Sequence, residues 1–138
     1  MQASSASPIA QVRVARATHQ LEAVSDFYLR GLGLPELYRF NDHDGFRGIM
    51  IGLPGTGCHL EFTEESGALP FPPPSPDHLL VLYYPDAAQR DLACQALEAW
   101  GAAPIAPHNP YWTAQGVTYE DPDGWRVVLF AGRFAAAQ

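Results

Sequence analysis

The sequence has little cysteine and no cysteine pairing pattern. Only two cysteines, Cys58 and Cys94, occur in 138 residues. Neither belongs to a Cys-x-x-Cys pair, and no histidine stands at a zinc-finger spacing from them, so neither a disulfide framework nor a structural zinc site is indicated. We therefore expect two reduced thiols and a cytoplasmic protein.

Positive charge and long apolar runs are also scarce. The sequence has eight Lys and Arg residues and 15 Asp and Glu residues, which gives a formal net charge of −7. Such a chain is not expected to bind nucleic acid or an anionic membrane surface. No apolar run approaches the roughly 20 residues of a membrane-spanning helix. Residues 1–11, rich in Ala, Ser and Gln, lack the parts of a signal peptide and are predicted to form a disordered tail.

What is present is the pattern of one compact domain made of two similar halves. In the first half, alternation predicts a strand and a helical period predicts a helix, followed by three strands separated by turns. In the second half the same order returns, with a closing hairpin around Asp121-Pro122-Asp123-Gly124. The predicted elements are strands 12–17, 36–41, 46–53, 58–63, 78–84, 103–106, 116–120 and 125–130, and helices 19–32 and 87–100.

A proline-rich stretch separates the halves. Residues 64–77 contain five prolines, which lack the N–H that a sheet needs and favour extended chain, so we predict a semi-rigid linker. The glycines that end the two helices, Gly33 and Gly101, are 68 positions apart, and the last strands of the halves are 67 apart. These offsets indicate an internal duplication. The prediction is an α+β fold of two tandem βαβββ modules, 12–63 and 78–130, with a C-terminal tail at 131–138.

This order of motifs resembles the glyoxalase/bleomycin resistance/extradiol dioxygenase superfamily, the vicinal oxygen chelate proteins. The resemblance covers Val12 to Phe130 and implies a half-barrel of two sheets around a cavity, with homodimers common among relatives. It rests on three motifs: Phe27-Tyr28 with Gly31-Leu32-Gly33-Leu34, then Leu60-Glu61-Phe62-Thr63, and finally the Asp121-Pro122-Asp123-Gly124 hairpin.

The resemblance also implies where metal ligands would stand. Four positions supply ligands in the metal-using relatives, and here they fall on Arg13, Glu61, a position at His78 or Leu79, and Val128. An arginine cannot ligate a cation, and valine has no donor atom. We therefore expect no metal cofactor, and Glu61 and His78 would be the ligands if a divalent metal were bound. Arg13 and Glu61 should instead approach each other as a buried ion pair.

Alternation in strand 58–63 places His59, Glu61 and Thr63 on one face and apolar side chains on the other. The polar face is either solvated or lines the cavity, where His59 and Glu61 could perform acid–base catalysis or bind a polar ligand.

Arg126 and Phe130 share a face of the last strand. Tyr111, Trp112 and Tyr119 form an aromatic group with them. These side chains pack in the core, pack at a dimer seam, or contact a planar ligand.

Three functions follow as hypotheses. The first is a cavity protein that binds or sequesters a small molecule without a metal, with Arg13, His59, Glu61, Arg126, Phe130, Tyr111, Trp112 and Tyr119 as ligand-binding residues. The alternative is a metal-dependent glyoxalase-like lyase or a ring-cleaving dioxygenase. A dimeric module without a small ligand is a third reading. The sequence leaves open the ligand, and whether the modules pair within one chain or across two.

Overall fold

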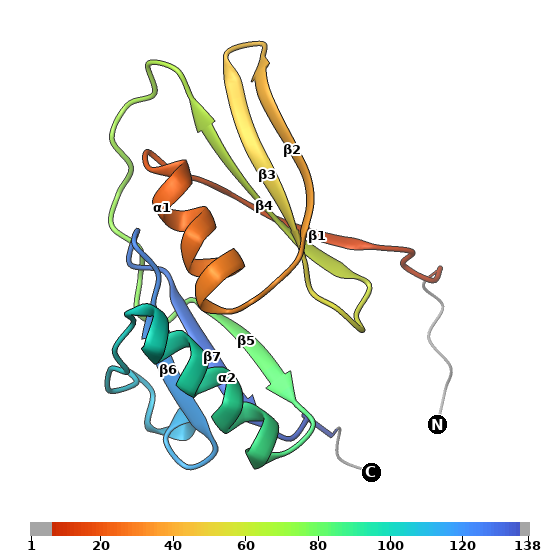
Figure 1. Cartoon of the computed structure of the whole chain (residues 1–138), viewed down its shortest axis with the longest axis vertical. Helices are drawn as coiled ribbons and strands as arrows, with labels where there is room; N and C mark the ends of the chain where they lie inside the picture. Colours follow the sequence, from red (N-terminus) through yellow and green to blue (C-terminus); the bar gives the residue numbers. More distant parts are fainter. Residues whose placement is uncertain (1–6, 136–138) are drawn as a thin grey trace.

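The computed structural model describes residues 7–135, and the predicted pair of modules is present in it (Figure 1). The first module comprises β1 (Val12–Ala17), α1 (Leu21–Asp26), the π-helical turn η1 (Phe27–Gly31), β2 (Glu36–His43), β3 (Phe46–Gly52) and β4 (Cys58–Glu65). The second comprises β5 (Leu79–Tyr84), α2 (Ala87–Trp100), the 3-10 turn η2 (Pro110–Trp112), β6 (Gly116–Glu120) and β7 (Arg126–Ala131).

Each module forms its own sheet. The first has the strand order β1-β4-β3-β2 and the second the order β5-β7-β6, and in both the first strand runs parallel to the last. A parallel neighbour needs a crossover connection, which the helix after the first strand provides. The α+β architecture predicted from the duplicated pattern is confirmed.

The predicted strand at 103–106 is wrong. Only an isolated bridge between Ile105 and Thr118 forms there, so the second sheet has three strands where the first has four. Pro104 and Pro107 flank the bridge, and proline has no N–H to donate to a ladder. The chain continues as a loop into η2, whose Trp112 packs on Phe130 of β7.

Smaller differences concern element ends. β4 continues two residues beyond the predicted strand, to Glu65, so the linker starts at Ser66. His78 lies outside β5, which begins at Leu79. The helix of the first module starts at Leu21 rather than His19, because the hydroxyl of Thr18 accepts a hydrogen bond from the backbone N–H of Gln20 and makes a local turn first.

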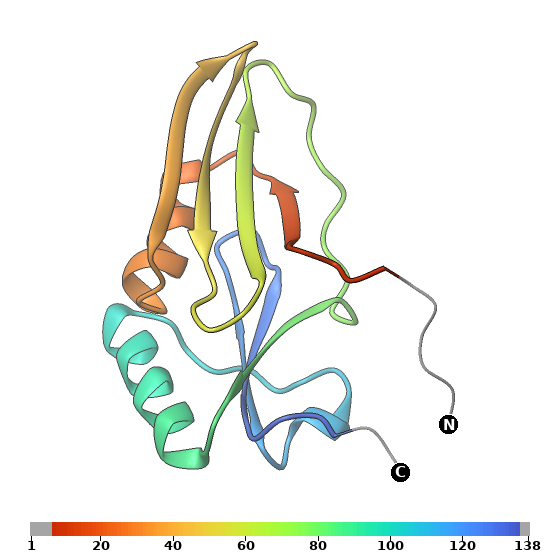
Figure 2. The same cartoon turned by 90° about the vertical axis from the view of Figure 1, so that its right-hand side faces the viewer.

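One apolar core joins the two modules. The helices lie next to each other at the junction of the sheets in Figures 1 and 2. The core combines Leu60 and Phe62 of β4 with Val127 and Leu129 of β7 and with apolar residues of both helices. The face of each sheet that turns toward α1 and α2 is therefore buried, and its opposite face carries no α-helix. We call these opposite faces the first and second open faces.

A buried hydrogen bond crosses the junction. The hydroxyl of Tyr28, in η1, donates to Oδ2 of Asp121 over 2.9 Å. The other carboxylate oxygen of Asp121 accepts the backbone N–H groups of Asp123 and Trp125, which closes the turn of the last hairpin. Burial raises the pKa of Asp121 above its ordinary value, while these three donors oppose that shift by stabilising the ionised form. The hydrogen bonds thus offset the cost of burying the carboxylate.

None of the helices within residues 7–135 combines the length and the apolar character that crossing a membrane would require. Within the same residues, Cys58 and Cys94 are both free thiols, as predicted.

We expect Tyr28→Phe to lower the free energy of unfolding by about 1–3 kcal/mol, because it leaves a buried carboxylate oxygen without its donor. Tyr38→Phe is the matched control, since the Tyr38 side chain is 58% exposed. The check is urea unfolding of wild type and both variants. Equal midpoints for the two variants would show that the bond between Tyr28 and Asp121 contributes nothing.

Candidate functional site

The first open face is built from aligned positions of neighbouring strands. Glu61 of β4 pairs with Ala15 of β1 and with Met50 of β3, and Met50 pairs with Tyr38 of β2. His59 pairs in the same way with Arg13 and Gly52. Because paired residues project from the same side of a sheet, two adjacent rows of side chains cover this face.

Arg13 links the polar residues of these rows. Its Nε donates to Nε2 of His59 over 2.9 Å, its Nη2 lies 3.5 Å from the sulfur of Met50, and its Nη1 lies 3.7 Å from Oε1 of Glu61. The sequence predicted that Arg13 and Glu61 approach each other, and they do. No two-bond fork forms between them, however, because the guanidinium comes no closer to Glu61 than 3.7 Å.

The bond from Arg13 defines the state of the His59 ring. An arginine can only donate, so the accepting Nε2 must be unprotonated, and the proton of the neutral ring resides on Nδ1. The His59 side chain is buried. Its ring therefore holds the guanidinium in place and leaves its terminal nitrogens directed toward Met50 and Glu61.

The carboxylate of Glu61 has spare capacity. Its side chain is only 15% exposed, yet its nearest cationic nitrogen, on Arg13, is 3.7 Å away, which exceeds a normal hydrogen bond. Arg13 itself is 45% exposed, so in the single chain this ion pair is open on one side. The expectation of a fully buried pair is therefore wrong.

The second open face is aromatic. Phe130 packs edge to face with Tyr83 on one side, at 5.4 Å between ring centroids, and with Trp112 on the other, at 5.6 Å. Tyr111 extends this series from Trp112 at 4.9 Å. Four rings thus form a continuous series from β5 across β7 to the loop that replaces the missing strand.

Two predicted site residues of the second module serve the fold. Arg126 donates to the carbonyl oxygen of Ala106 over 3.4 Å and lies 3.6 Å from Glu120, and its side chain is only 17% exposed, so the guanidinium is held against the protein. Tyr119 is a correction, because its ring is wholly buried in the core and its hydroxyl donates to Glu98 of α2 over 2.6 Å. Burial and the neighbours Cys94 and Glu98 raise the pKa of Tyr119. Tyr119 cannot contact a ligand on the open face.

The structure settles which face the second module's family positions occupy. Leu79, not His78, begins β5, and it pairs with Arg126 on the second open face; His78 is exposed just before the strand. Val128 is buried on the same face. Neither Leu79 nor Val128 has a donor atom for a metal. Across residues 7–135, no three His, Cys, Asp or Glu side chains gather closely enough to hold a metal ion.

Sequence reasoning missed Met50, Tyr38 and Tyr83, which border the predicted residues on the open faces. Alternation could not reveal Met50 because, apart from Arg47, both faces of Phe46–Gly52 carry apolar residues. Tyr38 and Tyr83 stand in strands where large side chains occupy successive positions, so the face of each became clear only from the register.

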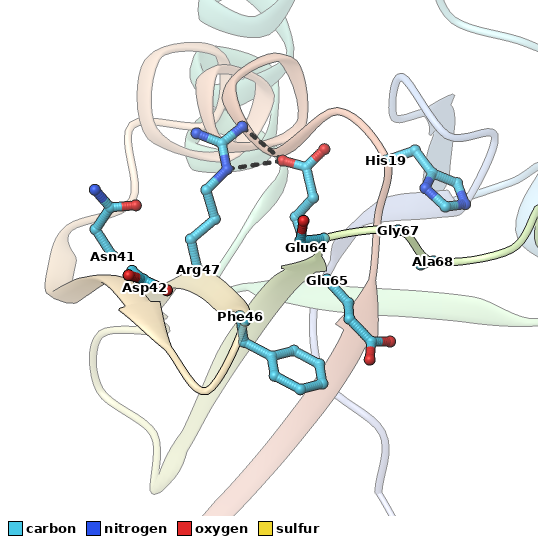
Figure 3. Close-up of a pocket in the computed structure, with 11 residues that line it drawn as sticks. His19, Asn41, Asp42, Phe46, Arg47, Glu64, Glu65, Gly67 and Ala68 are labelled. Atoms are coloured by element: carbon cyan, nitrogen blue, oxygen red, sulfur yellow. Dashed lines mark hydrogen bonds and ion pairs between the residues drawn. The ribbon is translucent and has the colours of Figure 1, made fainter.

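A separate polar hollow of about 500 Å³ lies at the tip of the β2–β3 hairpin (Figure 3). Arg47 and Glu64 point at each other across it, with hydrogen bonds of 2.9 and 2.6 Å. Arg47 also lies 3.7 Å from Glu22. Because the hydrogen bonds of Arg47 are taken by protein carboxylates, this hollow has fewer free donors for a ligand than the site around Arg13.

A mainly apolar groove of about 1100 Å³ runs along the edge strand β5. Leu34 and Leu53 of the first module line one side, and Val81 and Tyr83 line the other. Neither Glu61 nor Arg126 borders it. The groove shows that β5 has an uncovered edge, and it is distinct from the polar residues of the first open face.

Comparison with known proteins places the chain in a family. Residues 12–63 match the model of the YycE-like N-terminal domain and residues 77–131 that of the YycE-like C-terminal domain. The uncharacterized protein YycE of Bacillus subtilis (strain 168) is 45% identical over 120 residues, which cover 87% of this chain and 86% of that protein.

Two solved structures extend the comparison. A crystal structure of a YycE protein of unknown function from Bacillus subtilis is 42% identical, with a TM-score of 0.85 over 94% of both chains. A glyoxylase/bleomycin resistance protein/dioxygenase domain from Frankia sp. EAN1pec is 24% identical and shares the fold, with a TM-score of 0.68 over 94% of this chain and all (100%) of that one. The chain therefore belongs to the YycE-like family and has the fold of the glyoxalase/bleomycin resistance/dioxygenase proteins.

Proposed function

We propose that this protein binds or sequesters a small organic molecule at its open faces and does so without the metal that many members of the superfamily use. The polar residues of the site are Arg13, His59 and Glu61, and Tyr111, Trp112 and Phe130 supply its aromatic part, with Arg126 at its border. We place the protein in the cytoplasm, where thiols such as Cys58 and Cys94 stay reduced.

The observation that carries this proposal is the position of the Arg13 guanidinium. It binds the one nitrogen of His59 that lacks a proton and lies 3.7 Å from Glu61. The two side chains of this face that could ligate a metal therefore already face an internal cation. A divalent ion at the same place would be repelled by the guanidinium and would have to displace it from His59.

Exposed aromatic side chains on the open faces support a small organic ligand. Tyr38 and Tyr83 are exposed large side chains on the open faces. Ligand sites typically combine such surface with a few convergent polar groups. If the protein catalyses a reaction, Glu61 is suited to accept a proton and His59 to donate one from Nδ1, because Nε2 of His59 already accepts from Arg13.

We further propose that a second copy of the chain completes the cavity. Val12 and Val14 of the edge strand β1 are exposed, and so is Tyr111 beside the second open face. Uncovered strand edges and apolar side chains favour association with another sheet. A homodimer would cover these residues and enclose the open faces.

Light scattering should therefore give a mass of about twice the 15.1 kDa of one chain. Tyr111→Glu should shift the protein toward the monomer, because it places a charge in the proposed seam. Leu92→Glu makes the same kind of change at an exposed position of α2 and should leave the dimer intact. A wild-type mass of 15.1 kDa at all accessible concentrations would contradict the dimer.

Measuring the metal content of the purified protein tests the proposal that it works without a metal. Protein purified without chelator should contain far less than one iron, nickel, manganese or zinc per chain by mass spectrometry of the elements. Ligand binding should survive treatment with a chelator. One metal per chain that is lost in Glu61→Ala but kept in Glu64→Ala would instead support the metal-dependent lyase or dioxygenase.

A double-mutant cycle tests the contact between Arg13 and Glu61. Because Arg13 is 45% exposed, Arg13→Met and Glu61→Gln should show a coupling energy of up to about 1 kcal/mol in urea unfolding. The control cycle uses Arg30→Met and Asp26→Asn, whose pair is more exposed and 3.6 Å apart. A coupling no larger than that of the control would mean that Arg13 does not stabilise the Glu61 carboxylate.

A further inference from the structure

The polar group of the first open face leaves one strong donor and one strong acceptor unsatisfied. Nη2 of Arg13 faces the sulfur of Met50 at 3.5 Å, and a thioether is a weak acceptor. Glu61 has spare oxygen capacity because the nitrogen of Arg13 is 3.7 Å away. A ligand group that accepts from Arg13 and donates to Glu61 would bridge this separation.

The charges of the group select against ions. A ligand carboxylate could bind Arg13, but it would lie beside the carboxylate of Glu61. A ligand cation could bind Glu61, but it would lie beside the guanidinium. Since like charges at such distances repel and the two protein charges are of opposite sign, an uncharged group that is donor and acceptor at once fits both without repulsion.

The surroundings favour a flat apolar body behind that polar group. Glu61, Met50 and Tyr38 follow one another across three strands on this face, and Tyr38 is exposed. On the other side of Glu61, β1 presents only the methyl group of Ala15. A ring attached to the polar group could lie over Met50 and Tyr38, where sulfur–aromatic and aromatic contacts are favourable.

We propose that Arg13 and Glu61 together bind an uncharged carboxamide-like group carried on an aromatic ring, with the carbonyl accepting from Arg13 and the N–H donating to Glu61. His59 acts as a positioning residue, because it holds the guanidinium through Nε. This inference rests on the proposed function, since it assigns the ligand class of the same site.

Three probes of nearly equal shape test the inference: benzamide, which is neutral, benzoate, which is an anion, and benzamidine, which is a cation. Each is titrated into the full-length wild-type protein and followed by chemical shifts of the backbone and of the Arg13 side chain. Benzamide should bind on the order of tenfold more tightly than either ion, and the shifts should map to Arg13, His59, Glu61 and Met50.

Each of two variants should replace the preference for benzamide by a preference for one of the ions. In Arg13→Met the Glu61 carboxylate loses its internal cation, so benzamidine should become the tightest probe. In Glu61→Gln the Arg13 guanidinium loses its carboxylate partner, so benzoate should become the most tightly bound probe. The controls Arg30→Met and Asp26→Asn change the net charge equally at an exposed pair elsewhere and should keep the wild-type order. If one of the two site variants does not fold, the order of probe affinities in wild type and in the other variant still tests the inference.

The inference is overturned if benzoate or benzamidine binds wild type at least as tightly as benzamide, or if the variants keep the wild-type order. It is also overturned if none of the probes binds. A screen of uncharged and charged aromatic fragments then separates the two proposals, because fragments that shift open-face residues would keep the proposed function. No fragment binding at either open face would remove both.

Discussion

The structure depends on the burial of one carboxylate at the junction of its two modules. Asp121 is almost inaccessible, and Tyr28 and two backbone N–H groups satisfy it. A buried carboxylate without these donors would be costly. The helix end that contains Tyr28 and the last hairpin are therefore required to meet in one geometry, and the apolar core around them follows from that placement.

Other contacts reinforce the same junction. The side chain of Gln20 donates to the carbonyl of Pro122 and to the carboxylate of Asp123. The guanidinium of Arg16 lies 4.3 Å from the ring centre of Trp125, a cation–π distance. Two sequence motifs that are distant in the chain, one at the end of the first helix and one in the last hairpin, thus describe the two sides of a single contact. Their joint presence reflects how the modules dock.

The sequence was informative wherever only one face of an element is apolar. Alternation in β4 separated Leu60 and Phe62, which are in the core, from His59 and Glu61, which are on the open face. It was less informative in β3, where apolar residues stand on both faces. Tyr119 could have been assigned correctly, because Thr118 and Glu120 beside it are polar and imply that Tyr119 points inward. The strand expected at 103–106 failed because Pro104 within it and Pro107 directly after it were not weighed against its apolar residues.

The geometry of the polar site could be predicted only in part, for a reason that concerns side-chain length. Backbone position places Arg13 and Glu61 on one face, but a long guanidinium can choose among all acceptors within its reach. Here its Nε donates to His59, its direct neighbour across the strands, while Nη2 faces Met50 and Nη1 lies 3.7 Å from Glu61. As a result, neither charge of the pair is fully satisfied within the protein. That residual capacity, rather than the presence of the charges, is what makes this part of the open face suited to a ligand.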